Sequence, residues 1–314
     1  MENSGFPQRQ VMDDEIDLLE LWNILWKGKW IIILITTIFA VGSVAYALWL
    51  PDIYRSEMLL SPVDDSSEGA NSALLGQIGG IANLAGIDIG GGTSATNKVR
   101  ALAILKSRAF VKDFFERHDL TVTFMASRPT GMSGEVEINP ELYNLENQQW
   151  VREVKPPRQS EPTDWEIYRE FSKILTVVED IETGLITVGL EWYDPMQIQE
   201  WLIWLVQDLN EIMRGRELAE ANRAIEYING QLARTQLVSM QNVFYTLIEQ
   251  QTRTVMLADI RDEYALETLD PAVVAEEKSA PSRALICIIG TLLGGMLSTL
   301  FVFLPHAFSK RKSE

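Results

Sequence analysis

Cysteine and histidine are almost absent from this chain of 314 residues, which contains one cysteine, Cys287, and two histidines, His118 and His306. A single cysteine cannot form a disulfide within the chain, and so few cysteine and histidine side chains cannot build a Cys/His metal site. A histidine-centred catalytic triad would depend on His118, because His306 lies beyond an apolar run near the C-terminus. We therefore expect no metal, no cofactor and no catalytic residue, and predict that the protein is not an enzyme.

Basic residues are also few, with 27 Lys and Arg against 44 Asp and Glu, so that the formal net charge is −17. Such a charge disfavours polyanions, and nucleic acid is excluded as a first hypothesis for the partner. The glycine-rich tract of residues 64–97 has no lysine at the spacing of a phosphate-binding loop, so we interpret it as a flexible or membrane-proximal loop. In so acidic a chain, adjacent carboxylates such as Asp262 and Glu263 indicate a solvated surface.

Two long apolar runs without a charged residue cover residues 30–50 and 284–304. As helices, each would extend about 31 Å, which matches the hydrocarbon core of a bilayer. Buried core helices are a weaker interpretation, because helices of that length normally carry a polar face. A cleaved signal peptide is also weaker, because the residues before the first run are long and acidic. We therefore predict two transmembrane helices.

Lysine and arginine near the two spans predict their orientation. Lys27 and Lys29 precede the first span, and basic residues at 310–312 follow the second, whereas Arg55, Lys278 and Arg283 lie on the other side. This modest excess predicts that residues 1–29 and 305–314 are cytoplasmic. The large segment 51–283 would then be periplasmic, and the protein would lie in a bacterial inner membrane.

The segment between the spans alternates between strand and helix patterns. Strands are predicted at 53–60, 120–125, 174–179 and 185–192, the last two as a hairpin with Gly184 in its turn. Helices are predicted at 98–117 and 165–175, and residues 131–163 form an irregular insert. The fold class is therefore an α+β domain flanked by two transmembrane helices.

No proline interrupts the chain between Pro195 and Leu269, and apolar residues recur there at helical spacing. Asp194 and Pro195 form a favourable N-cap and first-turn pair. A continuous helix over about 195–269 would reach about 100 Å and would need lateral partners. Two or three shorter helices folded on one another are the alternative.

The second span and the segment before it contain two kinds of candidate site. The glycines are candidates for helix packing, and the prolines are candidates for an extended connector. Gly290 and Gly294 form a G-x-x-x-G motif with Gly295 beside it, which predicts close helix packing within or between subunits. Pro271 and Pro281 are predicted to belong to an extended connector between the outer domain and the second span. The first span has a weaker small-residue face, which includes Ser43 and Ala47.

Aromatic residues near the base of the long helix allow two interpretations. Trp192, Trp201 and Trp204 could stack on sugar rings, but packing in the domain is the more common use of such residues. His118, next to Asp119, is interpreted as a capping or surface residue rather than a catalytic one.

The layout as a whole resembles the Wzz-type chain-length determinant family, the polysaccharide co-polymerases of the O-antigen class that lack a kinase domain. The resemblance rests on the acidic segment 14–22 before the first span, on Tyr54-Arg55-Ser56 after it, and on residues 103–108, 269–274 and 279–286. It implies an α/β domain near the membrane, a long extended helix and a ring-like homo-oligomer. The related tyrosine autokinases continue into an ATP-binding domain, which is not expected in this chain.

The resemblance also implies a function: setting the modal length of a polysaccharide, the lipopolysaccharide O-antigen, as a membrane-anchored scaffold. The expected partners are further copies of the chain, the O-antigen polymerase of the inner membrane, the growing polysaccharide and the lipid bilayer. Two other hypotheses use the same two-span layout, namely a periplasmic adaptor of an export complex and a two-span sensor. Copurification with a polymerase would favour the first hypothesis, and copurification with an outer-membrane channel would favour the adaptor.

Overall fold

The computed structural model describes residues 25–63, 93–130, 135–156 and 158–310. The chain divides into two compact units, Met1–Leu50 with Pro281–Glu314 and Pro51–Ala280. Most of the predicted cytoplasmic segment 1–29, most of the glycine-rich tract and the last four residues lie outside the described residues. So do the side chains of residues 305–310, and with them that of His306.

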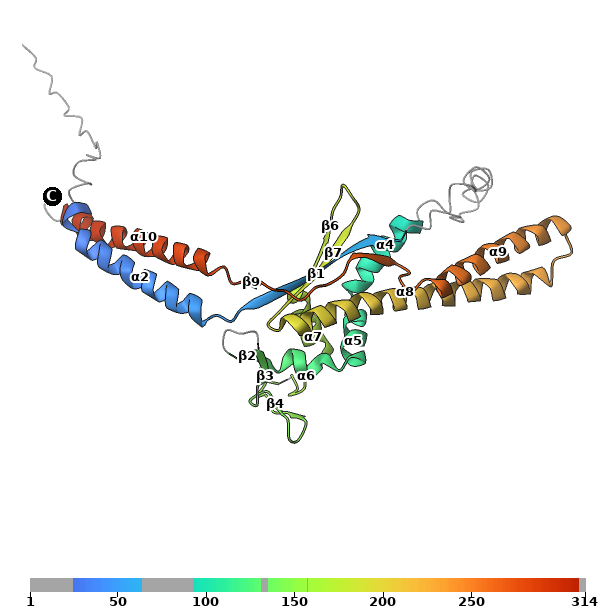
Figure 1. The fold of residues 1–314 in the computed structure, drawn as a ribbon, viewed down its shortest axis with the longest axis horizontal. Helices are drawn as coiled ribbons and strands as arrows, with labels where there is room; N and C mark the ends of the chain where they lie inside the picture. Colours follow the sequence, from blue (N-terminus) through green and yellow to red (C-terminus); the bar gives the residue numbers. More distant parts are fainter. Residues whose placement is uncertain (1–24, 64–92, 131–134, 157, 311–314) are drawn as a thin grey trace, which may run out of the picture. The chain divides into compact units, whose positions relative to one another are not determined.

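The first unit is a pair of helices, α2 (Lys29–Trp49) and α10 (Arg283–Lys310), which lie side by side (Figure 1). Both are long and apolar enough to cross a membrane. Few of their side chains are buried within the protein, as expected for helices whose surroundings are lipid rather than other protein segments. The positions predicted for the two spans therefore agree with two regular helices.

The second unit is built on a five-stranded antiparallel sheet. Its strands are β1 (Ile53–Pro62), β6 (Leu175–Glu179), β7 (Ile186–Trp192), β8 (Leu266–Asp270) and β9 (Lys278–Ala280). The order is β6-β7-β1-β8, and β9 also pairs with β1. The predicted hairpin is present as β6 and β7, and Gly184 in its turn has a φ of 72°, which glycine adopts without strain.

One face of this sheet carries most of its buried side chains. In the register of β1 with β7, Met58 lies opposite Val188 and Leu60 opposite Ile186, and all four side chains are buried. Alternate residues of a strand point to the same face. These residues therefore form one apolar surface, against which α8 (Pro195–Leu232) packs through contacts with β1 and β7.

Shorter helices complete the core around an aromatic cluster. They are α4 (Thr93–Leu105), α5 (Arg108–Arg117), α6 (Leu120–Met125) and α7 (Asp164–Ile174). Phe115 of α5, Phe124 of α6 and Phe171 of α7 are buried with ring centroids 5.1 to 6.1 Å apart. Such offset and edge-to-face contacts contribute beyond their burial, so these rings hold the small helices together.

The insert between α6 and α7 contains two small antiparallel hairpins. The first pairs β2 (Ser127–Thr130) with β3 (Glu135–Ile138), and the second pairs β4 (Tyr143–Asn144) with β5 (Gln149–Trp150). The sequence predicted an irregular segment at 131–163. The hairpins were missed because their strands have only four and two residues each and stand among prolines and short polar runs.

Of two predictions before the insert, the helix was wrong in part and the strand was wrong. The helix expected over 98–117 is interrupted at residues 106–107, where the Ser107 hydroxyl accepts a hydrogen bond from the Phe110 N–H and begins α5 as its N-cap. Residues 120–125 form helix α6 instead of a strand. Leu120 and Phe124, its buried residues, are four positions apart, a spacing that fits both a strand face and a helix face.

The long helix predicted over about 195–269 is two helices. It ends at Leu232, and α9 (Val238–Ile260) then returns along α8, so the pair forms a helical hairpin (Figure 1). The residues that follow α9 form β8 rather than helix. The turn is stabilised by Thr235, whose hydroxyl donates to the Gln231 carbonyl and whose own carbonyl accepts from the Gln241 amide. The alternative of shorter, back-folded helices is therefore the observed one.

Candidate functional site

Close contact between α2 and α10 occurs at two glycines of the predicted G-x-x-x-G motif. A Cβ added to Gly290 would clash with the Cβ of Ser43, and one added to Gly294 would lie 2.5 Å from the Cβ of Phe39. No side chain larger than hydrogen fits at either position unless the helices separate. This geometry is typical of helix pairs in lipid, where packing of backbones replaces the hydrophobic effect as the driving force.

Three further contacts connect the two helices along their length. A Cβ added to Gly28 would lie 2.5 Å from the side chain of Val302. In the middle of the pair, the hydroxyls of Thr36 and Ser298 lie 3.4 Å apart. Near the C-terminus of α2, the Arg283 guanidinium donates to the Ala47 carbonyl over 3.1 Å. A cation at a helix C-terminus also interacts favourably with the helix dipole.

Gly295 differs from its neighbour Gly294. No described atom outside its own helix turn lies within 4 Å of a Cβ added to Gly295, and the same holds for Gly42 of α2. Gly42 lines an apolar crevice of about 550 Å³ between the helices, together with Ile38, Tyr46 and Ile289. The glycines predicted as one packing site thus divide into two that contact α2 and one that faces open space.

The connector around Pro271 runs along β1 and is held by side chains from two elements. Pro271 directly follows β8, and the two residues after it accept hydrogen bonds through their carbonyls. The Gln199 amide donates to Ala272 and the Ser56 hydroxyl to Val273, each over 2.9 Å. Pro281 follows β9 and directly precedes the N-terminal turn of α10.

Asn210 of α8 fixes the start of β8, and sequence reasoning missed it. The side chain is buried, its Oδ1 accepts from the N–H groups of Ala265 and Leu266 at 2.8 and 2.9 Å, and its Nδ2 donates to the Leu266 carbonyl. The oxygen and the nitrogen of this buried amide both have hydrogen-bond partners, and these bonds orient α8 relative to β8. The sequence gives no clear signal for it, because Asn210 stands among other polar residues, Gln207, Asp208 and Glu211.

The tryptophans considered for sugar stacking have structural contacts. Trp192 and Trp201 are buried, with exposed fractions of 8% and 3%, and both contact the Phe124 ring. Trp204 stacks face to face on His118 at 4.5 Å between ring centroids. Trp192 and Trp201 are therefore core residues, and one ring face of the half-buried Trp204 is occupied by His118, so packing is the better interpretation.

His118 lies in a charged cluster between α5 and α8. Its Nε2 lies 3.0 Å from Oδ2 of Asp208, and Arg117 donates to Oδ1 of the same carboxylate over 3.0 Å. Arg117 also pairs with Glu211. His118 itself is the C-cap residue of α5, so the structure places it in a capping and helix-bridging position.

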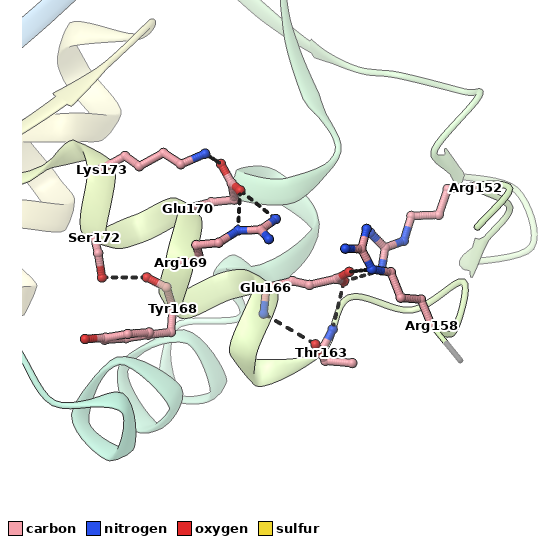
Figure 2. Close-up of polar contacts among 9 residues, drawn as sticks. All are labelled: Arg152, Arg158, Thr163, Glu166, Tyr168, Arg169, Glu170, Ser172 and Lys173. Atoms are coloured by element: carbon pink, nitrogen blue, oxygen red, sulfur yellow. Dashed lines mark hydrogen bonds and ion pairs between the residues drawn. The ribbon is translucent and has the colours of Figure 1, made fainter. Parts of the chain in front are cut away.

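A second charged cluster fixes the insert to α7 (Figure 2). The buried carboxylate of Glu166 accepts from Arg152 at 2.5 Å, and Arg158 lies 3.8 Å away. Thr163 and Glu166 also form a reciprocal capping box at the start of α7. The hydrogen bond from Arg152 lowers the pKa of Glu166, an effect that burial opposes. The spacing Thr163-x-x-Glu166 is readable in the sequence, but the contribution of Arg152 is not.

Acidic residues are numerous, and their arrangement was considered as a possible metal site. Among the described residues, no group of three or more His, Cys, Asp or Glu side chains could hold a metal ion. Adjacent carboxylates of the chain, such as Glu179 with Asp180 and Asp262 with Glu263, have different contacts. Glu179 pairs with Lys98 at 2.6 Å, Asp180 accepts the N–H of Glu182 in the β6–β7 turn, and Asp262 lies 3.8 Å from Arg214.

These features define a class: an α+β domain bracketed in sequence by two helices that can cross a membrane, and that pack on each other through glycine. Residues 14–118 match the model of the family described as Wzz, chain length determinant protein. This match confirms the resemblance to Wzz-type chain-length determinants, and the matched segment includes the first apolar helix, β1, α4 and α5.

Other comparisons add little to this match. No curated protein matches the chain significantly. A solved structure described as a full-length bacterial polysaccharide co-polymerase matches 95% of this chain and 100% of its own, with 13% sequence identity and a TM-score of 0.38. A likeness this weak carries no argument about the present chain.

Proposed function

We propose that this protein is a non-enzymatic regulator of polysaccharide chain length, and that the polysaccharide is the lipopolysaccharide O-antigen. The family match over residues 14–118 is the observation that carries the proposal. The arrangement of the chain supports it, because a domain bracketed by two apolar helices provides an anchored scaffold. The polar clusters around His118 and Glu166 support a structural role, since every described member has a partner that orders an element.

In this proposal the protein lies in a bacterial inner membrane with both termini in the cytoplasm. Residues 30–50 and 284–304 cross the bilayer, and residues 51–283 form the periplasmic domain. The basic residues at Lys27, Lys29 and Lys310 support this orientation through the positive-inside rule. The close contacts at Gly290 and Gly294 would hold the two spans as one hairpin, and the open face at Gly295 would be available to a neighbouring subunit.

The working form would be a homo-oligomer that acts with the polymerase. Large apolar side chains are exposed along the α8–α9 hairpin, which supports association through this region; they include Tyr227, Leu237, Val238, Val243, Tyr245, Met256 and Ile260. The assembly would determine how long the polymerase retains the growing chain. The connector with Pro271 and Pro281 would lead the chain from this domain to the second span.

The direct test is the length distribution of surface polysaccharide in a deletion strain, separated on a gel and compared with the parent strain. The proposal predicts loss of the modal band pattern and its recovery when the gene is restored. An unchanged distribution in the deletion strain would refute the function. Copurification of the tagged protein in detergent then distinguishes the partners, because an outer-membrane channel in place of a polymerase would indicate an export adaptor.

A further inference from the structure

A polar cavity of about 550 Å³ lies where the insert meets the junction of α5 and α6. It is separate from the paired helices, from the connector and from the cluster at His118. Hydroxyl, amide and carboxylate groups dominate its lining, beside two aromatic rings; the lining includes Asp119, Tyr143, Gln149, Trp150, Ser160 and Glu161. A cavity with this composition is suited to a ligand that offers many hydroxyls and a few apolar C–H faces.

The aromatic wall comes from the β4–β5 hairpin. Tyr143 and Trp150 lie directly opposite each other in the hairpin register, with ring centroids 5.1 Å apart in an edge-to-face arrangement. Both side chains are only half-buried. They differ in this respect from Trp192 and Trp201, which the domain core covers. A partly open indole beside polar groups provides the apolar surface on which the C–H face of a sugar ring can stack.

The segment with Ser160 and Glu161, which also lines the cavity, is bound by Arg152, a member of the cluster with Glu166 that Figure 2 shows. The guanidinium of Arg152 donates to the carbonyls of Gln159 and Ser160 and also binds Glu166. Since Arg152 follows Trp150 by two residues, one side chain connects the aromatic strand with the segment that carries Ser160 and Glu161. Arg152 thus connects the two segments that line the cavity, and such a connection limits the conformational entropy that ligand binding would cost.

The charge of the lining restricts the class of ligand. Asp119 and Glu161 contribute carboxylates, and none of the residues that line the cavity is a lysine, arginine or histidine. An acidic sugar or a phosphate would meet like charge without a compensating cation. Carboxylate and amide oxygens instead accept hydrogen bonds from neutral hydroxyls. The lining thus favours an uncharged glycan over an acidic one.

We propose that this cavity binds uncharged sugar units of a polysaccharide chain, with Trp150 as the stacking platform and Glu161 as a hydrogen-bond acceptor. The choice of a glycan rests on the proposed function, whereas the preference for a neutral one rests on the lining residues. The site would give the protein direct contact with the polymer in addition to any contact with a polymerase.

The test uses the full-length protein in detergent micelles and measures binding by isothermal titration calorimetry and saturation-transfer NMR. The probes are neutral hexasaccharides of glucose, mannose or N-acetylglucosamine, with hexagalacturonate as the acidic counterpart. We expect binding of at least one neutral probe and not of the acidic one. Trp150→Ala should weaken that binding about tenfold, as expected for loss of an aromatic stacking contact of about 1.4 kcal/mol, and Trp150→Phe should restore most of it.

Two further variants make the result specific. Trp165→Ala removes an exposed tryptophan of α7 outside the cavity and should leave binding unchanged. Glu161→Gln removes one carboxylate with little change in shape, and should reduce the discrimination against hexagalacturonate. Circular dichroism of each variant controls for folding.

The outcomes separate this proposal from the proposed function. Absence of binding for every neutral probe at millimolar concentration, or equal binding by Trp150→Ala and wild type, would overturn the cavity proposal. Either result could occur while the deletion strain still loses its modal length distribution, and the proposed function would then remain. Binding that is weakened about tenfold in Trp150→Ala and unchanged in Trp165→Ala would support the assignment of the cavity.

Discussion

The α2–α10 pair and the α8–α9 hairpin are both pairs of antiparallel helices, but different contacts hold them together. In the first pair, Gly290 and Gly294 bring the helices so close that an added methyl group would clash with the partner helix. In the second, a Cβ added to Gly215 or Gly230 of α8 would meet no described atom within 4 Å. The same residue type is therefore a point of contact in one pair and an unfilled position in the other.

The difference follows from what surrounds each pair. Apolar side chains gain nothing by leaving lipid for a helix interface, so a pair in a bilayer depends on close packing and a few polar contacts. In water, burial of apolar area is the main favourable term. The hairpin fits this account, because the buried residues of α8 lie between Ile198 and Met213, over the sheet, and only Ala221 is buried further along. The distal part of α8 has little core of its own.

The largest effect should come from the proximal part of α8. Leu209 is fully buried, and Leu209→Ala should lower the free energy of unfolding by about 3–5 kcal/mol because it removes buried methyl groups and leaves a cavity. Leu237→Ala in the hairpin turn, where the side chain is 67% exposed, is the matched control and should change it by less than about 0.5 kcal/mol. Chemical denaturation of the detergent-solubilised protein, followed by circular dichroism, measures both. Equal losses would show that the distal hairpin is as tightly packed as the core.

Adjacent glycines of α10 provide the next test. Gly294→Ala should cost about 1–3 kcal/mol, since the added methyl group overpacks the contact with Phe39. Gly295→Ala adds the same methyl group to the next residue, where it meets open space within the chain. Pairing of the helices can be measured by disulfide formation between cysteines placed at Thr36 and Ser298, with Cys287 replaced by serine. We expect a lower yield for Gly294→Ala only, and equal yields would contradict the proposed packing role.

Acid should affect the two units differently. The pKa of Glu166 is lowered by its hydrogen bond with Arg152. The ionised form of Glu166 is therefore more favourable in the native state than in the unfolded chain. The stabilisation is fully present above the unfolded-state value of about 4.3 and is lost as pH falls through the lower, folded-state pKa. Protonation of Glu166 should not affect the pairing of α2 with α10. The yield of the disulfide between these helices, assayed after acid exposure and return to neutral pH, should therefore be unchanged.

Arg152→Ala tests the same contact at neutral pH. It leaves the Glu166 carboxylate with Arg158 at 3.8 Å, and should cost about 1–2 kcal/mol because a charge-assisted hydrogen bond to a buried group is lost. Arg158→Ala is the control, since its side chain is 61% exposed, and should cost less. Glu166→Gln should remove the contribution of this residue to the acid sensitivity. A pH dependence that persists unchanged in that variant would assign it to other carboxylates.

Much of the fold was predictable because the deciding signals are local. Two uninterrupted apolar runs indicated α2 and α10, the alternation of residues 185–192 indicated β7, and Asp194 with Pro195 indicated the start of α8, where the Asp194 carboxylate accepts from the N–H of Met196. The sequence also predicted that Gly290 and Gly294 lie on a helix face that packs closely against another helix. Their partners could not be predicted, because the register of two helices distant in sequence depends on the three-dimensional arrangement.

Other features could not be predicted for reasons that specific residues show. The turn between α8 and α9 contains neither glycine nor proline, and its geometry depends on side-chain hydrogen bonds of Thr235 and Gln241. Leu120 and Phe124 have a spacing that fits either a strand or a helix, and tertiary packing against other rings selects the helix. The cavity in the insert combines Asp119 with Trp150 and Glu161, and no sequence spacing connects residues from three separate segments.

The smallest effect, and the one of opposite sign, is expected at the distal glycines of α8. Gly230→Ala adds a methyl group where no described atom lies within 4 Å, and should stabilise the hairpin by about 0.5–1 kcal/mol because alanine loses less conformational freedom in a helix than glycine does. Gly215→Ala should behave alike. Hydrogen exchange of the α8 amides reports this locally, with slower exchange expected in both variants. If the protein forms the proposed homo-oligomer, faster exchange at residue 230 in the oligomer, but not in dissociated subunits, would instead show that a neighbouring subunit approaches α8 at this glycine. The contrast with Gly290 and Gly294 would then hold only within a single chain.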